Sequence, residues 1–329
     1  MLMKDYISDF SNHLIEAMKI GENKNLENKN LNINNVLIAG LGGSGIGGTI
    51  IADVFAAKVN IPILISKDYS LPNFVNKNTL VIASSYSGNT EETIYAVKKA
   101  LKMNAEVAII TSGGKLKKIA EKNNLNKIYI PGGHPPRAMF GYSFTQLFYL
   151  LNHYNVIDLS FVSEFKKSVS LLVKNEKNIK DGALMLAKNL YNKTPVIYVA
   201  HGFEGVATRF RQQLNENSKM LCWHHVIPEM NHNELLGWRV NVDKLAVVFF
   251  RNELDNKRNK IRIEINKEVV KKHTKDVYEV ISQGDSVIQN TLYHIHFGDW
   301  VSWYLSELND VDAIEIDVIN YLKKELAKF

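Results

Sequence analysis

Short apolar runs alternate with amphipathic helical patterns along nearly the whole chain. The runs are almost continuously hydrophobic, which is typical of strands that are buried on both faces of a parallel sheet. Five in the first half are predicted to be strands: 36–39, 62–66, 80–83, 107–111 and 127–130. Five more follow in the second half: 196–200, 221–224, 245–250, 277–281 and 313–318. This alternation predicts an α/β protein with two doubly wound, flavodoxin-like parallel sheets, whose ligands bind at the carboxyl ends of the strands.

Helices are expected where apolar residues recur every three or four positions. The expected segments are 4–20, 140–154, 162–190 and 287–308, and a polar connector covers 21–35. A chain of 329 residues with 46% hydrophobic residues can bury a large core and has room for about two domains. We expect an N-terminal domain over residues 1–155 and a C-terminal domain over residues 156–329.

Two loops in the first half have the composition of anion-binding turns. The segment 40–48 follows the first predicted strand and contains six glycines, which let the backbone approach a ligand closely. The segment 84–93 follows the third predicted strand, and Ser85, Ser87 and Thr90 in it precede a helical pattern. A helix N-terminus attracts anions through its free N–H groups and its dipole, and hydroxyl groups can add donors. Together the loops indicate a site for a phosphorylated small molecule.

Each loop also has another interpretation. Ser87 or Asn89 could simply cap the following helix. The glycines from Gly40 to Gly45 match the G-x-G-x-x-G dinucleotide fingerprint, and Asp68 lies where that class places its ribose-binding carboxylate. The hydroxyl loop is not part of the dinucleotide pattern, however. Two anion-binding turns at one sheet edge favour the phosphorylated small molecule.

The net charge and the cysteine content indicate which kinds of partner and which cellular compartment suit the protein. The formal net charge is +6, but no basic stripe with interleaved aromatic residues is present, so a nucleic-acid partner is not supported. The single cysteine, Cys222, excludes internal disulfides, fits a reducing cytoplasm and is predicted to be a small buried hydrophobe. No signal peptide and no run of membrane-spanning length is visible, so we expect a cytoplasmic protein.

The segment 132–137 combines two glycines and two prolines before Arg137. Because the prolines restrict the backbone, the guanidinium of Arg137 could be held with little loss of entropy. A purely structural turn with a solvated arginine is equally compatible with this local sequence.

A second group of polar residues covers 209–234. Amide side chains surround Glu216, and His232 follows sixteen residues later. A carboxylate and an imidazole have ordinary pKa values on the acidic side of neutrality, so modest burial could turn either into a general acid or base. The alternative is a surface acid and a loop histidine. His224, His225, Glu229 and His232 could suggest a metal site, but no pair has the His-x-x-x-His spacing of a helical zinc motif, and we expect none.

Five motifs occur in the order GLGGSGIGG, SYSGNTEET, GHPPRAMFGY, QLNENSK and HNELLGW, between residues 40 and 238. They resemble the bifunctional phosphoglucose/phosphomannose isomerases of the sugar isomerase (SIS) domain superfamily. The resemblance implies two SIS domains and an aldose–ketose isomerisation of glucose 6-phosphate or mannose 6-phosphate to fructose 6-phosphate, without metal or cofactor. It implies phosphate binding by Gly43, Ser44, Ser85, Ser87 and Thr90.

The resemblance also implies roles for the catalytic residues. Arg137 would stabilise an enediolate, Glu216 would carry the proton between C1 and C2, and His232 would help to open the sugar ring from the other subunit of a homodimer. A C-terminal lysine of the family matches Lys323, with Lys324 a near-equal rival. The family's tolerance of both C2 epimers has been linked to a threonine shortly before that lysine, and this chain has no threonine after Thr291.

Two other classes remain open at this point. A nicotinamide-dependent oxidoreductase would use Asp68 on a ribose. A non-catalytic sugar-phosphate-binding protein would need the phosphate loops but not Arg137, Glu216 and His232. A complete glucosamine-phosphate synthase is not expected, because its glutaminase half is absent from this sequence.

Overall fold

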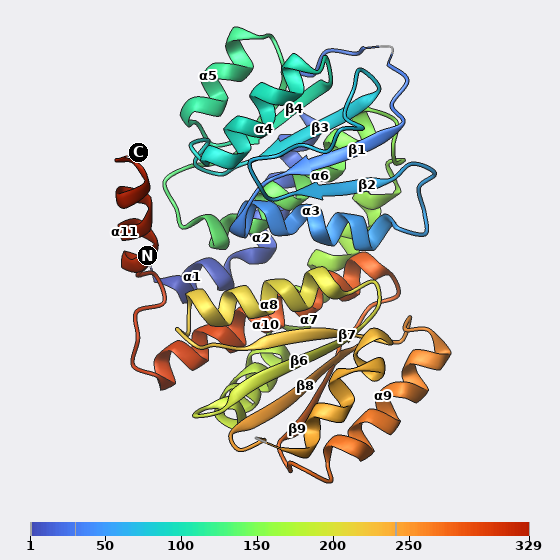
Figure 1. Cartoon of the computed structure of the whole chain (residues 1–329), viewed down its shortest axis with the longest axis vertical. Coiled ribbons are helices and arrows are strands. Elements are labelled where there is room, and N and C mark those ends of the chain that lie inside the picture. The colour runs from blue at the N-terminus through green and yellow to red at the C-terminus, as the bar shows by residue number, and fades with distance from the viewer. Residues whose placement is uncertain (1, 30, 241, 329) are drawn as a thin grey trace.

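Two parallel sheets form the frame of the protein (Figure 1). The computed structural model describes residues 2–29, 31–240 and 242–328. The strand orders are β2-β1-β3-β4-β5 and β7-β6-β8-β9, which are doubly wound, flavodoxin-like arrangements. The strands are β1 (Asn35–Ala39), β2 (Ile63–Ser66), β3 (Thr79–Ser84), β4 (Glu106–Thr111), β5 (Asn126–Tyr129), β6 (Thr194–Ala200), β7 (Trp223–Ile227), β8 (Leu245–Arg251) and β9 (Val277–Ile281). Nine of the ten predicted strands are therefore confirmed.

The tenth predicted strand, 313–318, is wrong. Residues 311–316, which we call the C-terminal connector, form no regular element, and helix α11 (Asp317–Leu326) begins directly after them. The carbonyl oxygens of Ala313 and Ile314 accept hydrogen bonds from the side chain of Arg137. These carbonyls are thus committed to an arginine of the first domain instead of a neighbouring strand.

The predicted helices are confirmed, except that one of them is split into two. The segment 4–20 forms two helices, α1 (Met3–Ser8) and α2 (Phe10–Glu22), because Asp9 leaves the helical conformation and ends one helix where the next begins. The long patterns correspond to α6 (Phe140–His153), α7 (Ser160–Leu190) and α10 (Val287–Leu308). The remaining elements are α3 (Gly42–Phe55), α4 (Glu91–Lys102), α5 (Gly114–Lys122), α8 (Glu204–Glu216), α9 (Lys257–Val270), η1 (Pro136–Met139), η2 (Glu229–His232) and η3 (Glu234–Arg239).

Helices α3 and α8 lie side by side between the two sheets (Figure 1). The contact is close, because a Cβ on Gly205 of α8 would lie only 2.9 Å from the Cα of Ile50 in α3. Helices α4 and α5 cover the outer face of the first sheet, and α9 covers the outer face of the second. The inner faces of both sheets contribute to one continuous hydrophobic core with the helices between them.

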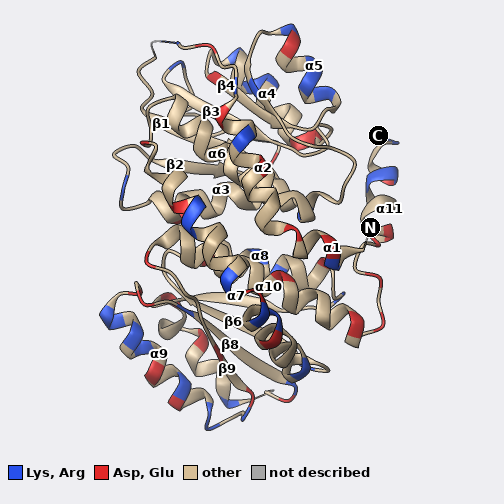
Figure 2. Cartoon of the chain, turned by 180° about the vertical axis from the view of Figure 1, so that it is seen from behind, with Lys and Arg blue, Asp and Glu red and all other residues tan. Residues whose placement is uncertain are grey.

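Lys and Arg residues are spread over the surface of both domains with Asp and Glu residues between them (Figure 2). Helix α9 illustrates this mixture, since it carries both basic and acidic residues along its length (Figure 2). Within the described ranges, no helix is both long and apolar enough to cross a membrane. No face of the described part of the protein is uniformly basic in this view (Figure 2), so any attraction of an anion must come from individual basic residues near the site.

Candidate active site

The glycine loop places the N-terminus of α3 at the carboxyl end of β1. A Cβ on Gly45 would collide with the carbonyl of Gly40, so the turn requires glycine there. A Cβ on Gly43 would lie 3.0 Å from the Cα of Arg137, which brings the backbone of η1 against the first turn of α3. Leu41 is the N-cap of α3, and its side chain makes no capping hydrogen bond. The first turn of α3 thus lies beside the arginine, with its N-terminal dipole uncompensated by a cap.

The hydroxyl loop joins β3 to α4 next to this turn. The Oγ of Ser85 lies 2.8 Å from the Oγ1 of Thr90, which is the N-cap of α4. The backbone N–H of Tyr86 donates to the Oγ of Ser44 at 2.9 Å, so the two loops are directly connected. A hydroxyl that accepts one hydrogen bond still keeps its own proton, so Ser44 can donate to a phosphate oxygen. The exposed Ser87 accepts a hydrogen bond from the N–H of Asn89 and retains the same capacity.

Arg137 is almost completely buried, with 3% of its surface exposed. Its Nε donates to Oδ1 of Asn217 at 2.7 Å, and its Nη1 lies 3.3 Å from Oε2 of Glu216. Burial lowers the pKa of Arg137 below its ordinary value, and the nearby carboxylate of Glu216 opposes that change. Because an arginine guanidinium stays protonated in proteins, the site holds a fixed, oriented cation.

Glu216 is the last residue of α8, and its side chain is 27% exposed. It therefore reaches the first domain's arginine while staying accessible to a small molecule. Lys219 donates to the carbonyl oxygens of Glu216 and Glu315 at 2.6 and 2.8 Å, which ties the end of α8 to the C-terminal connector. A proton acceptor and a fixed cation thus lie next to each other at the junction of the two domains.

The structure separates His232 from Glu216 within one chain. Helix α8 packs its Phe210 and Leu214 on the inner face of the second sheet. Segment η2, which ends at His232, packs its Met230 on the outer face of the same sheet, and the imidazole is exposed. The two residues therefore belong to opposite faces of the sheet and do not flank a single site in this chain.

Lys323 and Lys324 both lie on α11 and both are exposed. Helix α11 has no buried residue and projects from the body of the protein on the side where the N-terminus lies (Figure 1). It is reached through the C-terminal connector, which contacts Arg137 and Lys219. The helix that carries both lysines thus follows directly after a segment that contacts Arg137 and Lys219. The two lysines are both exposed, so neither is favoured over the other.

Comparisons with known proteins identify the family. Residues 179–326 match the family model for the bacterial phospho-glucose isomerase C-terminal SIS domain, and residues 31–152 match the SIS domain. A bifunctional phosphoglucose/phosphomannose isomerase from Caldicellulosiruptor bescii is 38% identical, covering 82% of this chain and 83% of the relative. One from Aquifex aeolicus is 32% identical, with 82% of each chain covered. The chain belongs to the bifunctional phosphoglucose/phosphomannose isomerase family.

The solved structures agree on the fold of this isomerase family member. The C-terminal domain of glucosamine-fructose-6-phosphate aminotransferase from Francisella tularensis superimposes with a TM-score of 0.73 at 12% identity, covering 95% of this chain and 96% of that chain. At this identity the similarity shows the fold alone. The prediction of two SIS-type α/β sheets is confirmed.

The structure also reveals residues that the sequence of this isomerase did not single out. Asn217, from the same motif as Glu216, is fully buried and binds the Nε of Arg137. Arg209 donates to the backbone carbonyl oxygen of Arg137 at 3.3 Å, and Tyr86 accepts a hydrogen bond from the N–H of His134 in the preceding loop. The many polar residues of 209–219 were a signal for Asn217 and Arg209. Their partner, Arg137, lies 80 and 72 positions away from them along the chain. Such long-range partners cannot be read from local spacing.

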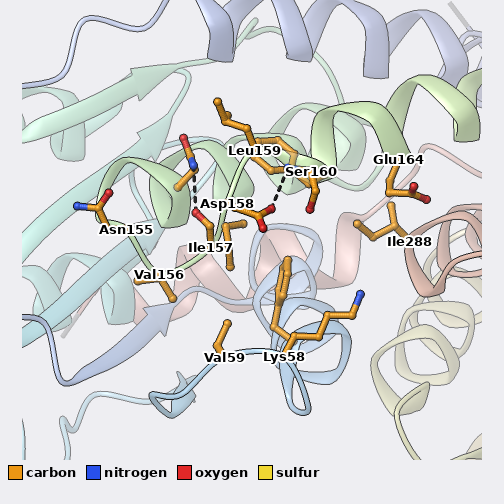
Figure 3. A pocket seen from close by; sticks show the side chains of 13 residues that line it. Lys58, Val59, Asn155, Val156, Ile157, Asp158, Leu159, Ser160, Glu164 and Ile288 are labelled. Atoms are coloured by element: carbon orange, nitrogen blue, oxygen red, sulfur yellow. Dashed lines mark hydrogen bonds between the residues drawn. The ribbon is translucent and has the colours of Figure 1, made fainter.

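A cavity of about 630 Å³ lies elsewhere, between the ends of α3 and α6 and the starts of α7 and α10 (Figure 3). Figure 3 shows Lys58, Asp158 and Glu164 around it, together with apolar residues such as Val156. None of the candidate site residues lines it. The cavity adjoins the C-terminal end of α3, whereas the phosphate loops adjoin its N-terminal end, roughly 20 Å away for a helix of this length. We therefore seek the phosphate site at the loops and not in this cavity.

Two of the histidines considered for a metal site, His224 and His225, have other partners. The Nε2 of His224 lies 3.2 Å from the Oγ1 of Thr208, and burial lowers the pKa of this histidine. The ring of His225 accepts a hydrogen bond from the N–H of Val226. In the ranges 2–29, 31–240 and 242–328, no three His, Cys, Asp or Glu side chains form a group able to hold a metal ion.

Proposed function

We propose that this protein interconverts glucose 6-phosphate and mannose 6-phosphate with fructose 6-phosphate. The observation that carries the proposal is the contact of 3.3 Å between Arg137 and Glu216, in which a carboxylate lies beside a buried cation next to the glycine loop. The names and similarity of the relatives support the same reaction. The isomerisation moves one proton between neighbouring carbons and one between their oxygens, and these two side chains would serve the transfer between the carbons.

The phosphate loops would hold the substrate by its phosphate. Gly43 and Ser44 belong to the first turn of α3, and Ser85, Ser87 and Thr90 precede α4. Both helix N-termini provide N–H groups and a favourable dipole, and the hydroxyls provide uncharged donors. Holding the phosphate end fixes the distance to C1 and C2, which brings the reacting carbons to Glu216.

The chemical step follows from the positions of the two charged groups. The carboxylate of Glu216 removes the proton from C2 of the open-chain aldose, and the electrons move onto the carbonyl oxygen at C1. The negative charge that develops there is stabilised by Arg137, more strongly in the transition state than in the neutral substrate. The proton of the C2 hydroxyl moves to the oxygen at C1, Glu216 returns its proton to C1, and the C2 oxygen becomes the carbonyl of the ketose.

Ring opening requires a further acid or base, which we assign to His232 of a second chain. The exposure of His232 and its place on the other face of the second sheet from α8 support delivery from a partner subunit. Lys323, or its neighbour Lys324, would assist from α11. We accordingly propose a homodimer with shared active sites.

A subunit-mixing experiment tests the shared site. Glu216→Gln and His232→Ala chains are refolded together after each has been shown to be inactive. Half of the dimers should be hybrids with one intact site of two, so the mixture should regain about a quarter of wild-type activity by the symmetry count. If both residues came from one chain, every site would carry a defect, and hybrid dimers verified by mass spectrometry would remain inactive.

Substrate choice is tested by coupled assays. Fructose 6-phosphate formation is measured from glucose 6-phosphate and from mannose 6-phosphate at equal enzyme concentration. Activity with neither hexose phosphate would overturn the proposed function. Activity with only one of them would limit it to a single epimer, which is relevant because no threonine follows Thr291.

Two broader assignments accompany this function. We place the domain boundary at residue 155, in the turn between α6 and α7, and this lies between the two family matches. We assign the protein to the cytoplasm, since its single cysteine suits a reducing compartment and its proposed substrates are phosphorylated metabolites.

A further inference from the structure

Arg137 is a residue of the first domain, but its side chain is held by the second. Asn217 and Glu216 contact it from the end of α8. The carbonyl oxygens of Ala313 and Ile314 contact it from the C-terminal connector. Each of these contacts crosses from the first half of the chain to the second. The direction of the guanidinium is therefore set by the domain that does not carry it.

Asn217 can hold the guanidinium in one orientation. The Nε of Arg137 can only donate, so the amide oxygen of Asn217 must face it. The amide nitrogen donates to Oγ of Ser302 at 2.9 Å, and that hydroxyl donates in turn to the carbonyl oxygen of Asp299 at 2.7 Å. Both Asn217 and Ser302 are fully buried. The chain of donors and acceptors leaves the amide no alternative orientation that satisfies every group.

Arg209 holds the backbone of the same arginine. Its Nη2 donates to the carbonyl oxygen of Arg137 at 3.3 Å and to Oδ2 of Asp299 at 2.7 Å. Gln213 donates to the other carboxylate oxygen of Asp299 at 2.9 Å. The guanidinium of Arg209 also lies 4.3 Å from the ring centroid of Phe140, which follows η1. Arg209 thus contacts the backbone of η1 and the first residue of α6.

We propose that Asn217 and Arg209 are positioning residues for the isomerisation. Asn217 orients the guanidinium of Arg137, and Arg209 fixes the backbone from which that side chain extends. The inference rests on the proposed function, because it requires Arg137 to stabilise the enediolate. It adds that the junction between the two domains belongs to the catalytic apparatus. A displacement on the order of 1 Å of an oriented charge can reduce the rate strongly, so the contacts should affect turnover more than substrate binding.

The first test compares two buried asparagines. Asn217→Ala removes the acceptor for Arg137, whereas Asn290→Ala removes an equally buried amide whose partners are Ser282, Gly284 and Ser286. We expect Asn217→Ala to lower kcat about 10-fold, the loss typical of one hydrogen bond to a charged group, with KM changed less than about threefold. Asn290→Ala should leave kcat near the wild-type value even where it lowers the melting temperature. Equal effects of both variants on kcat would overturn the proposal.

The second test asks whether Asn217 acts through Arg137. In an Arg137→Gln background, Asn217→Ala should produce no further loss of kcat, because the group it positions is gone. A full additional loss in that background would overturn the positioning role. If Arg137→Gln alone left kcat unchanged, the proposed role of Arg137 would fail instead, so the two failures are distinguishable.

Two milder variants keep the test valid if Asn217→Ala does not fold. Ser302→Ala leaves Asn217 in place but removes the hydroxyl that orients its amide. Arg209→Lys keeps a cation near Asp299 but loses the planar guanidinium whose Nη2 donates both to Asp299 and to the carbonyl oxygen of Arg137. Each should weaken inhibition by a phosphorylated hydroxamate that mimics the enediolate, while inhibition by inorganic phosphate stays unchanged. Unchanged hydroxamate inhibition in both variants would overturn the proposal.

Discussion

Replacement of Glu216 by glutamine is expected to lower kcat by about 10²-fold to 10⁴-fold, the usual contribution of general acid–base catalysis. The amide preserves the shape of the side chain next to Arg137 but cannot accept the C2 proton. KM should change little, because the proposed phosphate site lies at the loops before α3 and α4. The measurement is a coupled assay together with exchange of the C2 hydrogen in deuterated water.

Glu204→Gln provides the matched control for this variant. Glu204 is the first residue of the same helix, α8, at the end away from Arg137, and its side chain is largely exposed. The control should keep nearly full activity. If Glu216→Gln exchanges the C2 hydrogen at the wild-type rate, a different residue is the base.

Removal of the buried cation should have a comparable effect. We expect Arg137→Gln to lower kcat about 10²-fold to 10³-fold, as found when a preorganised group that stabilises an oxyanion is deleted. Arg137→Lys should recover only part of the loss, because an ammonium group cannot match the fork that contacts Asn217, Glu216 and the C-terminal connector. Binding of the phosphorylated hydroxamate should weaken in parallel with kcat.

An exposed arginine serves as the reference for that experiment. Arg258 lies on α9, on the outer face of the second sheet, and Arg258→Gln should leave kcat and KM unchanged. The melting temperature of Arg137→Gln should also fall, since Glu216 and Asn217 lose their partner. A variant that loses stability but keeps kcat would show that Arg137 is structural only.

The fold was largely predictable because its signals are local. A central strand that is buried on both faces appears as an apolar run, and the partly exposed edge strands β2, β5, β7 and β9 were also recognised by their runs. The run 313–318 misled because its apolar residues alternate with Glu315 and Asp317, which is also the pattern of a half-exposed strand. The division at Asp9 was equally invisible, because an amphipathic pattern continues across it.

The site was predictable as a set of motifs but not as a geometry. Local sequence left Arg137 equally compatible with a solvated turn, and the structure buries it. The deciding contacts come from Asn217 and the C-terminal connector, and no local rule links residues so far apart along the chain. The position of His232 across the second sheet from α8 likewise follows from how η2 packs, which spacing does not encode.

The hydrophobic core that joins the inner faces of both sheets has a consequence for how the chain unfolds. Residues such as Leu147 in α6 and Leu292 in α10 belong to the same cluster as strands from both domains. Neither sheet can lose its inner layer without exposing apolar surface of the other. We expect one cooperative melting transition in calorimetry, with coinciding calorimetric and van't Hoff enthalpies, although the chain matches two separate domain families. A fragment of residues 1–155 should accordingly aggregate instead of folding alone. Each of the two matched domains is therefore smaller than the part of the chain that folds as one cooperative unit.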